Sequence, residues 1–216
     1  MTHITMSVNE KGCDFVVGDI HGQFDLLSIE LAKARFDKSK DRLFSVGDMI
    51  DKGSQSAEVL ELLAEPWFFA VCGNHEELAK HHLDQEWDKA NLWLFTRGGG
   101  WAIRYSTMEL NEILSPIPFL PVSIEVPMAN GRRYGIIHAC PPPVWGAFNE
   151  DDRHIYTQGR RRFDKKDDSV VVGIDRVFVG HNIVPRVNML GNVIYIDTGA
   201  YRTGNLTLIN MTKMEV

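Results

Sequence analysis

Three apolar segments in the first third of the chain each run into a glycine that is followed by an oxygen-bearing side chain. The segments are CDFVV (13–17), LFSV (43–46) and WFFAV (67–71). The side chains are Asp19, Asp48 and Asn74, at intervals of 29 and 26 residues. Each interval is long enough for a helix that returns the chain to a neighbouring parallel strand. Because the carboxyl ends of parallel strands lie at one edge of a sheet, these side chains are expected to meet there.

The segments between these strands have helical spacing. In residues 24–35 the apolar positions recur three and four apart, and residues 56–65 form a second predicted helix that ends before Pro66. The order is therefore β-α-β-α-β with a parallel sheet. A further helical stretch is expected from Glu76 to about Phe95, where the RGGGW turn breaks it.

The second half of the chain has short strands in place of this alternation. Asn130-Gly131 favours a tight hairpin turn between residues 121–126 and 132–139. Further strands are expected at 176–180, 186–190, 192–197 and 205–211. A parallel half joined to an antiparallel half predicts an α/β fold, with two sheets packed face to face and helices outside. We expect residues 1–216 to form a single domain.

Charge and composition limit the partners. The 216 residues carry a net charge of −6 with a pI near 5.7, which argues against general affinity for nucleic acid or anionic membranes. Three scattered cysteines are too few for a disulfide framework. No apolar run approaches the ~20 residues that cross a bilayer. We therefore expect a cytoplasmic protein that acts as a monomer.

Two later predicted strands also end at ligand-type side chains. They lead into His138 and His181, while His21 lies two residues after Asp19. Each residue alone is typical of a turn or a surface position, and only the joint pattern indicates a site. Aspartate and asparagine oxygens combined with neutral imidazoles suit manganese, iron or zinc better than calcium. Six such residues are enough for two ions if one carboxylate bridges them.

Five short motifs follow one another along the chain: GDIHG (18–22), GDMIDKG (47–53), GNHE (73–76), IIHA (136–139) and VGHN (179–182). In this order they resemble the phosphoprotein phosphatase family of metallophosphoesterases. The strings SVGDMIDKG, LWLFTRGGGW and YIDTGAYRTGNLTLI are similar to the small bacteriophage and bacterial members of that family. The resemblance spans nearly the whole chain. It implies the calcineurin-like metallophosphoesterase fold, with two mixed β-sheets packed as a sandwich flanked by helices.

The resemblance implies a role for each ligand-type residue. Asp19 and His21 would hold a first metal ion, which Asp48 would bridge to a second. The second site would be completed by Asn74, His138 and His181. The two divalent ions would be Mn²⁺, with iron or zinc as alternatives. A hydroxide shared by both would attack phosphorus in line with the leaving alkoxide.

Proton transfer and phosphate contacts are also implied by the resemblance. His75 would protonate the departing oxygen, with its imidazole oriented by Asp51. Phosphate contacts would fall to Lys52, Asn74, Arg160 and Arg162. For the arginines of TQGRRRF (157–163), a basic surface loop is an equal alternative.

The chain departs from the family pattern beside these motifs. Lys52 stands where relatives have arginine in Asp-Arg-Gly, so a point charge replaces a planar fork that can grip two phosphate oxygens. Cys72 stands where relatives commonly place arginine before GNHE. Phosphate should therefore be held more loosely. Trp93 and Trp101 flank the triple glycine, where either a wall of the substrate cleft or, by our preferred interpretation, plain packing explains them.

The implied activity is metal-dependent hydrolysis of phosphomonoesters. Its substrates would be phosphoserine and phosphothreonine in proteins, with phosphotyrosine or small phosphomonoesters in addition. Cleavage of dinucleoside polyphosphates or cyclic nucleotides is the alternative within the wider superfamily. The second alternative, of another class, is a phosphate-binding module that has lost turnover. The changes at Lys52 and Cys72 favour that module, while an intact pair of His75 and Asp51 argues against it.

Overall fold

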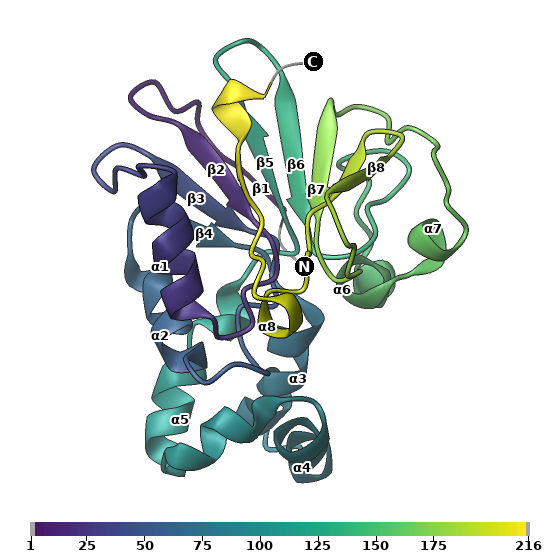
Figure 1. Cartoon of the computed structure of the whole chain (residues 1–216). Coiled ribbons are helices and arrows are strands. Elements are labelled where there is room, and N and C mark those ends of the chain that lie inside the picture. The colour runs from purple at the N-terminus through teal and green to yellow at the C-terminus, as the bar shows by residue number, and fades with distance from the viewer. Residues whose placement is uncertain (1–2, 215–216) are drawn as a thin grey trace.

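Two β-sheets pack face to face in the computed structural model, which describes residues 3–214 (Figure 1). The smaller sheet contains β2 (Asp14–Val17), β3 (Arg42–Ser45), β4 (Phe68–Ala70) and β10 (Leu208–Asn210). The larger contains β1 (His3–Thr5), β5 (Ser123–Pro127), β6 (Arg133–Ile137), β7 (Arg176–Val179), β8 (Asn188–Leu190) and β9 (Val193–Tyr195). Their orders are β10-β2-β3-β4 and β1-β5-β6-β7-β9-β8.

Helices lie outside the sheets. They are α1 (Phe24–Lys33), α2 (Ser56–Glu61), α3 (Asn74–Leu83), α4 (Trp87–Thr96), α5 (Thr107–Leu114), α6 (Arg153–Gln158), α7 (Arg161–Asp164) and α8 (Ala200–Thr203). Figure 1 shows α1 and α2 beside the smaller sheet, α6 and α7 beside the larger, and α3, α4 and α5 gathered at one end of the molecule. Among residues 3–214, no helix combines the length and apolar character that a membrane span requires.

Alternation along the strands produces three apolar layers. Val16 and Phe44 of the smaller sheet pack between the sheets against Phe178 and Ile194 of the larger. Because successive side chains point to opposite faces of a strand, the neighbouring residues pack on the outer faces. These neighbours are Phe15, Val17 and Leu43 in one sheet and Val177, Val179 and Val193 in the other. Both sheets are thus buried on two sides, which explains their nearly continuous apolar strands.

The first three strands pair as predicted. β2, β3 and β4 are parallel, with Val17 opposite Ser45 and Ser45 opposite Ala70. Their carboxyl ends are therefore level, and the loops that follow them start from one edge of the sheet.

The predicted antiparallel second half is wrong. β6 runs parallel to β7 and β7 parallel to β9, while the pairs β5–β6 and β8–β9 are antiparallel. The last strand, β10, joins the smaller sheet antiparallel to β2, and β1, which the sequence analysis missed, pairs with β5. The long crossover from β6 to β7 permits parallel pairing, and short strands alone carry no signal of direction. Both sheets are mixed, so the sandwich flanked by helices is confirmed.

The predicted helix over 76–95 is two helices. α3 ends at Leu83 and α4 begins at Trp87, with a turn between them in which Gln85 has a left-handed backbone (φ 57°). After α4, residues Gly99–Arg104 form a 3-10 helix. α5 was not predicted; it begins with a capping box between Ser106 and Glu109.

Candidate metal centre and active site

The six predicted metal ligands lie around one cavity, which is formed by loops that follow strands of both sheets. They are Asp19 and His21 after β2, Asp48 after β3, Asn74 after β4, His138 after β6 and His181 after β7. The cavity has a volume of about 90 Å³ and is also lined by Lys52, His75, Ile183 and Asp197. Of the six, His138 does not line it directly but contacts Asp48 and Asn74, which do.

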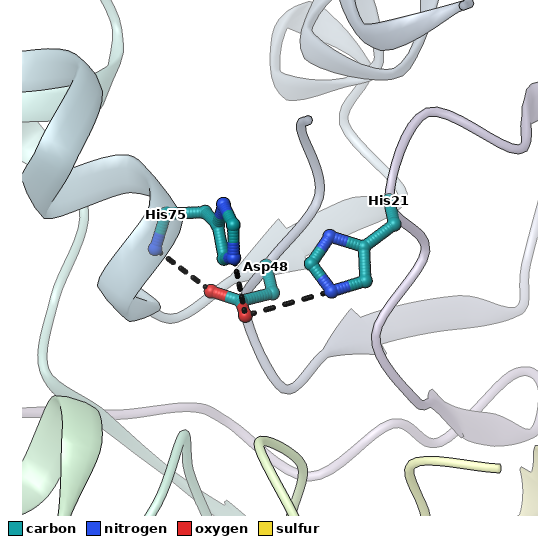
Figure 2. Close-up of side chains that lie close together, drawn as sticks. All are labelled: His21, Asp48 and His75. Atoms are coloured by element: carbon teal, nitrogen blue, oxygen red, sulfur yellow. Dashed lines mark hydrogen bonds and ion pairs between the residues drawn. The ribbon is translucent and has the colours of Figure 1, made fainter. Parts of the chain in front are cut away.

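Asp48 lies at the centre of this cluster and is 2% exposed. Its Oδ2 is 3.7 Å from Nε2 of His21 and 3.9 Å from Nε2 of His75, and its Oδ1 is 3.3 Å from Nε2 of His138. Figure 2 shows the rings of His21 and His75 on either side of this carboxylate, with the backbone N–H of His75 donating to Oδ1 at 3.0 Å. One oxygen of the carboxylate therefore faces His21 and His75 and the other faces His138, an arrangement that suits a ligand shared by two metal ions.

Backbone carbonyls orient two of the histidines. Nδ1 of His21 donates to the carbonyl of Ile50 at 2.9 Å, and Nδ1 of His138 donates to the carbonyl of Val46 at 2.8 Å. Because a carbonyl only accepts, Nδ1 carries a proton in both rings, and Nε2 of the neutral imidazole keeps its lone pair for a metal. In both cases Nε2 is the nitrogen that faces Asp48.

The side-chain amide of Asn74 contacts His138 and His181. Its Oδ1 lies 3.1 Å from Nε2 of His138 and 2.7 Å from Nδ1 of His181. Two triads share Asp48, and within each triad the three donor atoms lie within 4.8 Å of one another: His21, Asp48 and His75, and Asp48, His138 and His181. Carboxylate oxygen, amide oxygen and imidazole nitrogen together are a donor set that fits divalent manganese, iron or zinc. The residues present therefore fit a dinuclear centre.

Burial sets the charges around the cavity. It lowers the pKa of His21 to about 3 and that of His181 to about 4, so both imidazoles are neutral at pH 7. It also raises the pKa of Asp19 well above its ordinary value, and the nearby carboxylates of Asp197 and Asp48 raise it further. Carboxylates crowded in this way are relieved by a bound cation.

Strained backbone is concentrated at the same place. Among residues 3–214, eight non-glycine residues have positive φ. Five of them, with φ between 47° and 73°, are His21, Asp48, Asp51, Lys52 and His181. Such conformations cost of order 1–3 kcal/mol each and persist only where the surrounding structure holds them. The surrounding structure therefore holds these five residues in unfavourable backbone conformations, and these conformations set the directions of their side chains around the cavity.

His75 and Asp51 form a buried pair beside the cavity. Nδ1 of His75 lies 2.6 Å from Oδ2 of Asp51, which leaves Nε2 directed at Asp48. Burial opposes a charge on His75, but the carboxylate of Asp48 and the hydrogen bond that His75 donates to Asp51 outweigh it and raise the pKa of His75. Asp51 also accepts the indole N–H groups of Trp93 and Trp101, each at 2.8 Å. The interpretation of these tryptophans as plain packing residues missed this contact.

Comparison with known proteins places the chain in a family. The family model of the calcineurin-like phosphoesterases matches residues 15–185. The chain belongs to this family. Calcineurin-like phosphoesterases use a dinuclear divalent metal site, and this chain contains two groups of His and Asp side chains that could hold metal ions. The protein is a metallophosphoesterase, and therefore a hydrolase.

Named relatives of this phosphoesterase align along most of its length. Serine/threonine-protein phosphatase 2 of Salmonella typhimurium (strain LT2) is 35% identical over 204 residues, which cover 91% of this chain and 92% of that protein. Serine/threonine-protein phosphatase 1 of the same strain is 37% identical over 199 residues, or 90% and 89%. The solved structure of a cold-active protein-tyrosine phosphatase of a Shewanella species covers 98% of this chain and 78% of its own, with a TM-score of 0.57 and 17% identity, and so shares the fold.

The phosphoesterase cavity contains one of the predicted phosphate-binding cations. Nζ of Lys52 lies 2.9 Å from Nε2 of His21 and 4.5 Å from the ring centre of Tyr201. Arg160 lies outside the cavity lining, but its charge contributes to lowering the pKa of His181, after burial and His138. Arg160 is exposed, with its Nε 3.8 Å from Oδ1 of Asp164 and its guanidinium 5.9 Å from the ring centre of Phe163.

Arg162 is placed differently. It is 8% exposed, and its guanidinium donates to the backbone carbonyls of Ser169 and, at 3.2 Å, Leu190. It does not line the cavity of the metal centre. In this structure Arg162 holds the loop between α7 and β7 in place. The sequence TQGRRRF does not indicate that Arg162 is buried while Arg160 is exposed.

Two acidic residues beside the cavity escaped the sequence analysis. Asp197 is buried and follows β9, where an apolar strand running into an acid repeats the signal that identified Asp19. Glu76 is completely buried, and its carboxylate accepts the backbone N–H groups of Asp48, Met49 and Gly73, each at 2.8 Å. Glu76 thereby connects the loop after β3 to the loop after β4, and its place in GNHE was the available signal.

A third overlooked residue is Arg153 of α6. Its Nε donates to Oε1 of Glu77 at 2.7 Å, and the Cys72 thiol lies 3.3 Å from the same oxygen. Arg153 and Asn74 line one neighbouring cavity. A cation from a distant part of the chain therefore lies near position 72, where the family pattern has arginine.

Proposed function

We propose that the protein is a metal-dependent phosphatase that acts on phosphoserine and phosphothreonine in proteins. The observation that carries this proposal is the cluster of His21, His138 and His181 around Asp48, with His75 held beside the same carboxylate by Asp51. Support for the substrate class comes from relatives named serine/threonine-protein phosphatases, which align over about 90% of the chain.

The proposed metal ligands draw on both sheets. They are Asp19, His21, Asp48, Asn74, His138 and His181, with Asp48 as the bridge. Mn²⁺ is the expected metal, with iron or zinc as alternatives, because the donor set mixes hard oxygen with borderline nitrogen. When bound, two divalent ions supply a water of lowered pKa and neutralise charge on phosphate.

The protein's own groups then hold the substrate and move a proton. Nδ1 of His75 donates a hydrogen bond to Asp51, so Nε2 is directed at the cavity. The proton on Nε2 is then donated to the departing oxygen. Lys52 and the amide of Asn74, which line the cavity, contact phosphate oxygens, and Arg160, exposed between α6 and α7, would have to turn towards the cavity to join them. The chain acts as one catalytic unit because neither sheet carries the ligand set alone.

Turnover of p-nitrophenyl phosphate with Mn²⁺ or with a chelator tests the proposal. We expect sustained release of nitrophenolate with Mn²⁺ and its loss with the chelator. A panel of phosphoserine, phosphothreonine and phosphotyrosine peptides, diadenosine tetraphosphate and a cyclic nucleotide then determines the substrate class by comparison of kcat/KM. Preference for either nucleotide would overturn the protein-phosphatase proposal. Phosphate binding without turnover would identify a binding module.

Substitution identifies the residues responsible. Asp48→Asn is expected to lower Mn²⁺ affinity and abolish turnover, whereas His75→Asn is expected to lower kcat by about 10²–10⁴-fold, the usual contribution of a general acid, and to leave Mn²⁺ binding intact. His3→Asn is the matched control, because His3 lies on β1 with its ring 2.8 Å from the Ser123 hydroxyl and outside the cavity. Equal activity of all four proteins would contradict the assignments.

A further inference from the structure

Asp51 is held by two buried indoles. It is completely buried, and its carboxylate accepts three hydrogen bonds from described residues: His75 Nδ1 and Trp93 Nε1 on Oδ2, and Trp101 Nε1 on Oδ1. Trp93 is 0% exposed and Trp101 is 5% exposed. The two indoles thus occupy both oxygens of the carboxylate and fix its plane while Oδ2 meets the imidazole.

The triple glycine explains how both indoles reach one carboxylate. Trp93 lies on α4, and Trp101 lies on the 3-10 helix that begins at Gly99, the second of the three glycines. Gly98 has φ 101°, and its carbonyl accepts the backbone N–H of Lys52 at 3.0 Å. A Cβ at Gly99 would come within 2.7 Å of the Trp93 ring. The glycines therefore let the chain reverse directly against the Asp51-Lys52 turn and the first indole.

Neutral donors suit this position. A buried carboxylate without hydrogen bonds is costly, and an arginine in the same place would cancel its charge. Indole N–H groups satisfy the oxygens and leave the net charge of Asp51 for the imidazole of His75. Packing alone does not explain why both indole N–H groups meet the same carboxylate.

We propose that Trp93 and Trp101 are positioning residues that act through Asp51 on the proton donor His75. The inference rests on the proposed phosphatase function. It assigns to the segment LWLFTRGGGW a part in protonating the leaving group, in addition to its part in the core.

The test compares leaving groups. Trp93→Phe and Trp101→Phe remove the N–H donor and keep a smaller aromatic ring. Trp145→Phe is the matched control, because the Trp145 indole donates to buried Glu125 at the same distance of 2.8 Å, outside the cavity. Each Mn²⁺-loaded protein is assayed on phenyl phosphate, whose leaving group needs a proton, and on p-nitrophenyl phosphate, whose leaving group needs one much less.

We expect each tryptophan substitution to lower kcat for phenyl phosphate about tenfold and kcat for p-nitrophenyl phosphate less than about threefold, because one hydrogen bond to a charged group is lost. KM, Mn²⁺ affinity and Tm should stay close to those of Trp145→Phe. Equal loss on both substrates, or no loss, overturns the inference. Absence of turnover in the unsubstituted protein overturns the proposed function instead.

A second measurement does not depend on turnover. The five tryptophans give five indole N–H signals in a ¹⁵N-labelled sample. Asp51→Asn should shift the Trp93 and Trp101 signals, which the Phe variants identify, and leave those of Trp67, Trp87 and Trp145 unchanged. Unchanged Trp93 and Trp101 signals would show that the indoles do not contact the carboxylate in solution, which would overturn the inference even if the Phe variants fold poorly.

Discussion

Lys52 is the residue at which this chain departs most clearly from its family pattern. Its ammonium lies between Nε2 of His21 and the ring of Tyr201, within the cavity. A lysine supplies charge but no planar pair of donors, so it contacts phosphate oxygens one at a time. The ring of Tyr201 could stack against the guanidinium of an arginine at this position, since arginine is the more common cation partner of an aromatic ring.

We therefore expect Lys52→Arg to lower the KM for p-nitrophenyl phosphate, by roughly three- to tenfold, because a bidentate contact replaces a single one. Lys38→Arg is the matched control, since its Nζ also lies over an aromatic ring, 4.9 Å from the centre of Trp67, outside the cavity. Steady-state kinetics on the two variants and the unsubstituted protein measure this KM. An unchanged or higher KM in Lys52→Arg would show that the lysine is already the better fit.

At the scale of elements, the site depends on where strands end. Gly180, directly after β7, donates its N–H to the carbonyl of His138 at 2.9 Å. A Cβ at this glycine would overlap Oδ1 of Asp19. The absence of a side chain there lets the end of β7 approach the loop after β2, so that proposed metal ligands from different sheets come together.

Gly180→Ala should therefore lower Mn²⁺ affinity by about tenfold or more, because a proposed ligand must shift. Gly131→Ala provides the comparison: Gly131 has φ 83° and open space around it, so alanine strains the hairpin and lowers Tm without disturbing the cavity. Titration of Mn²⁺ into both variants separates the two effects. Equal Mn²⁺ affinity in Gly180→Ala and the unsubstituted protein would contradict this account of the strand end.

Much of this arrangement could be predicted from sequence because it follows from local pattern. Strands ending in glycine and an oxygen ligand, one βα unit apart, indicated that Asp19, Asp48 and Asn74 would meet. The direction of β7 and β9 could not be predicted, because a short apolar strand reads the same in either direction. The separation of Arg160 from Arg162 and the indole contacts of Asp51 depend on tertiary packing, which the spacing of residues does not encode.

At the scale of the whole molecule, the site joins the two sheets. The smaller sheet provides Asp19, Asp48 and Asn74, and the larger provides His138 and His181. Cations bound between them would hold the sheets together and offset the burial and the repulsion between carboxylates that raise the pKa of Asp19.

Metal binding should therefore stabilise the fold. At a Mn²⁺ concentration 100 times Kd, one site adds about 2.7 kcal/mol to the free energy of unfolding, equivalent to roughly 5–10 °C in Tm for a chain of this length. Thermal unfolding with a chelator and with increasing Mn²⁺ checks this, and Asp48→Asn should remove most of the rise. A Tm independent of Mn²⁺ would show that the cluster does not hold the ions in the folded state.

The placement of the ligands along the chain also bears on how the molecule matures. The donor from the loop after β2 and the donor from the loop after β7 are 162 residues apart, as in the contact between Asp19 and His181. A nascent chain that has emerged only as far as β4 can form the parallel strands but cannot yet close the cluster. Competence for phosphate chemistry would arise late in synthesis, when the second sheet docks, so a truncated product would be inert rather than an unregulated hydrolase.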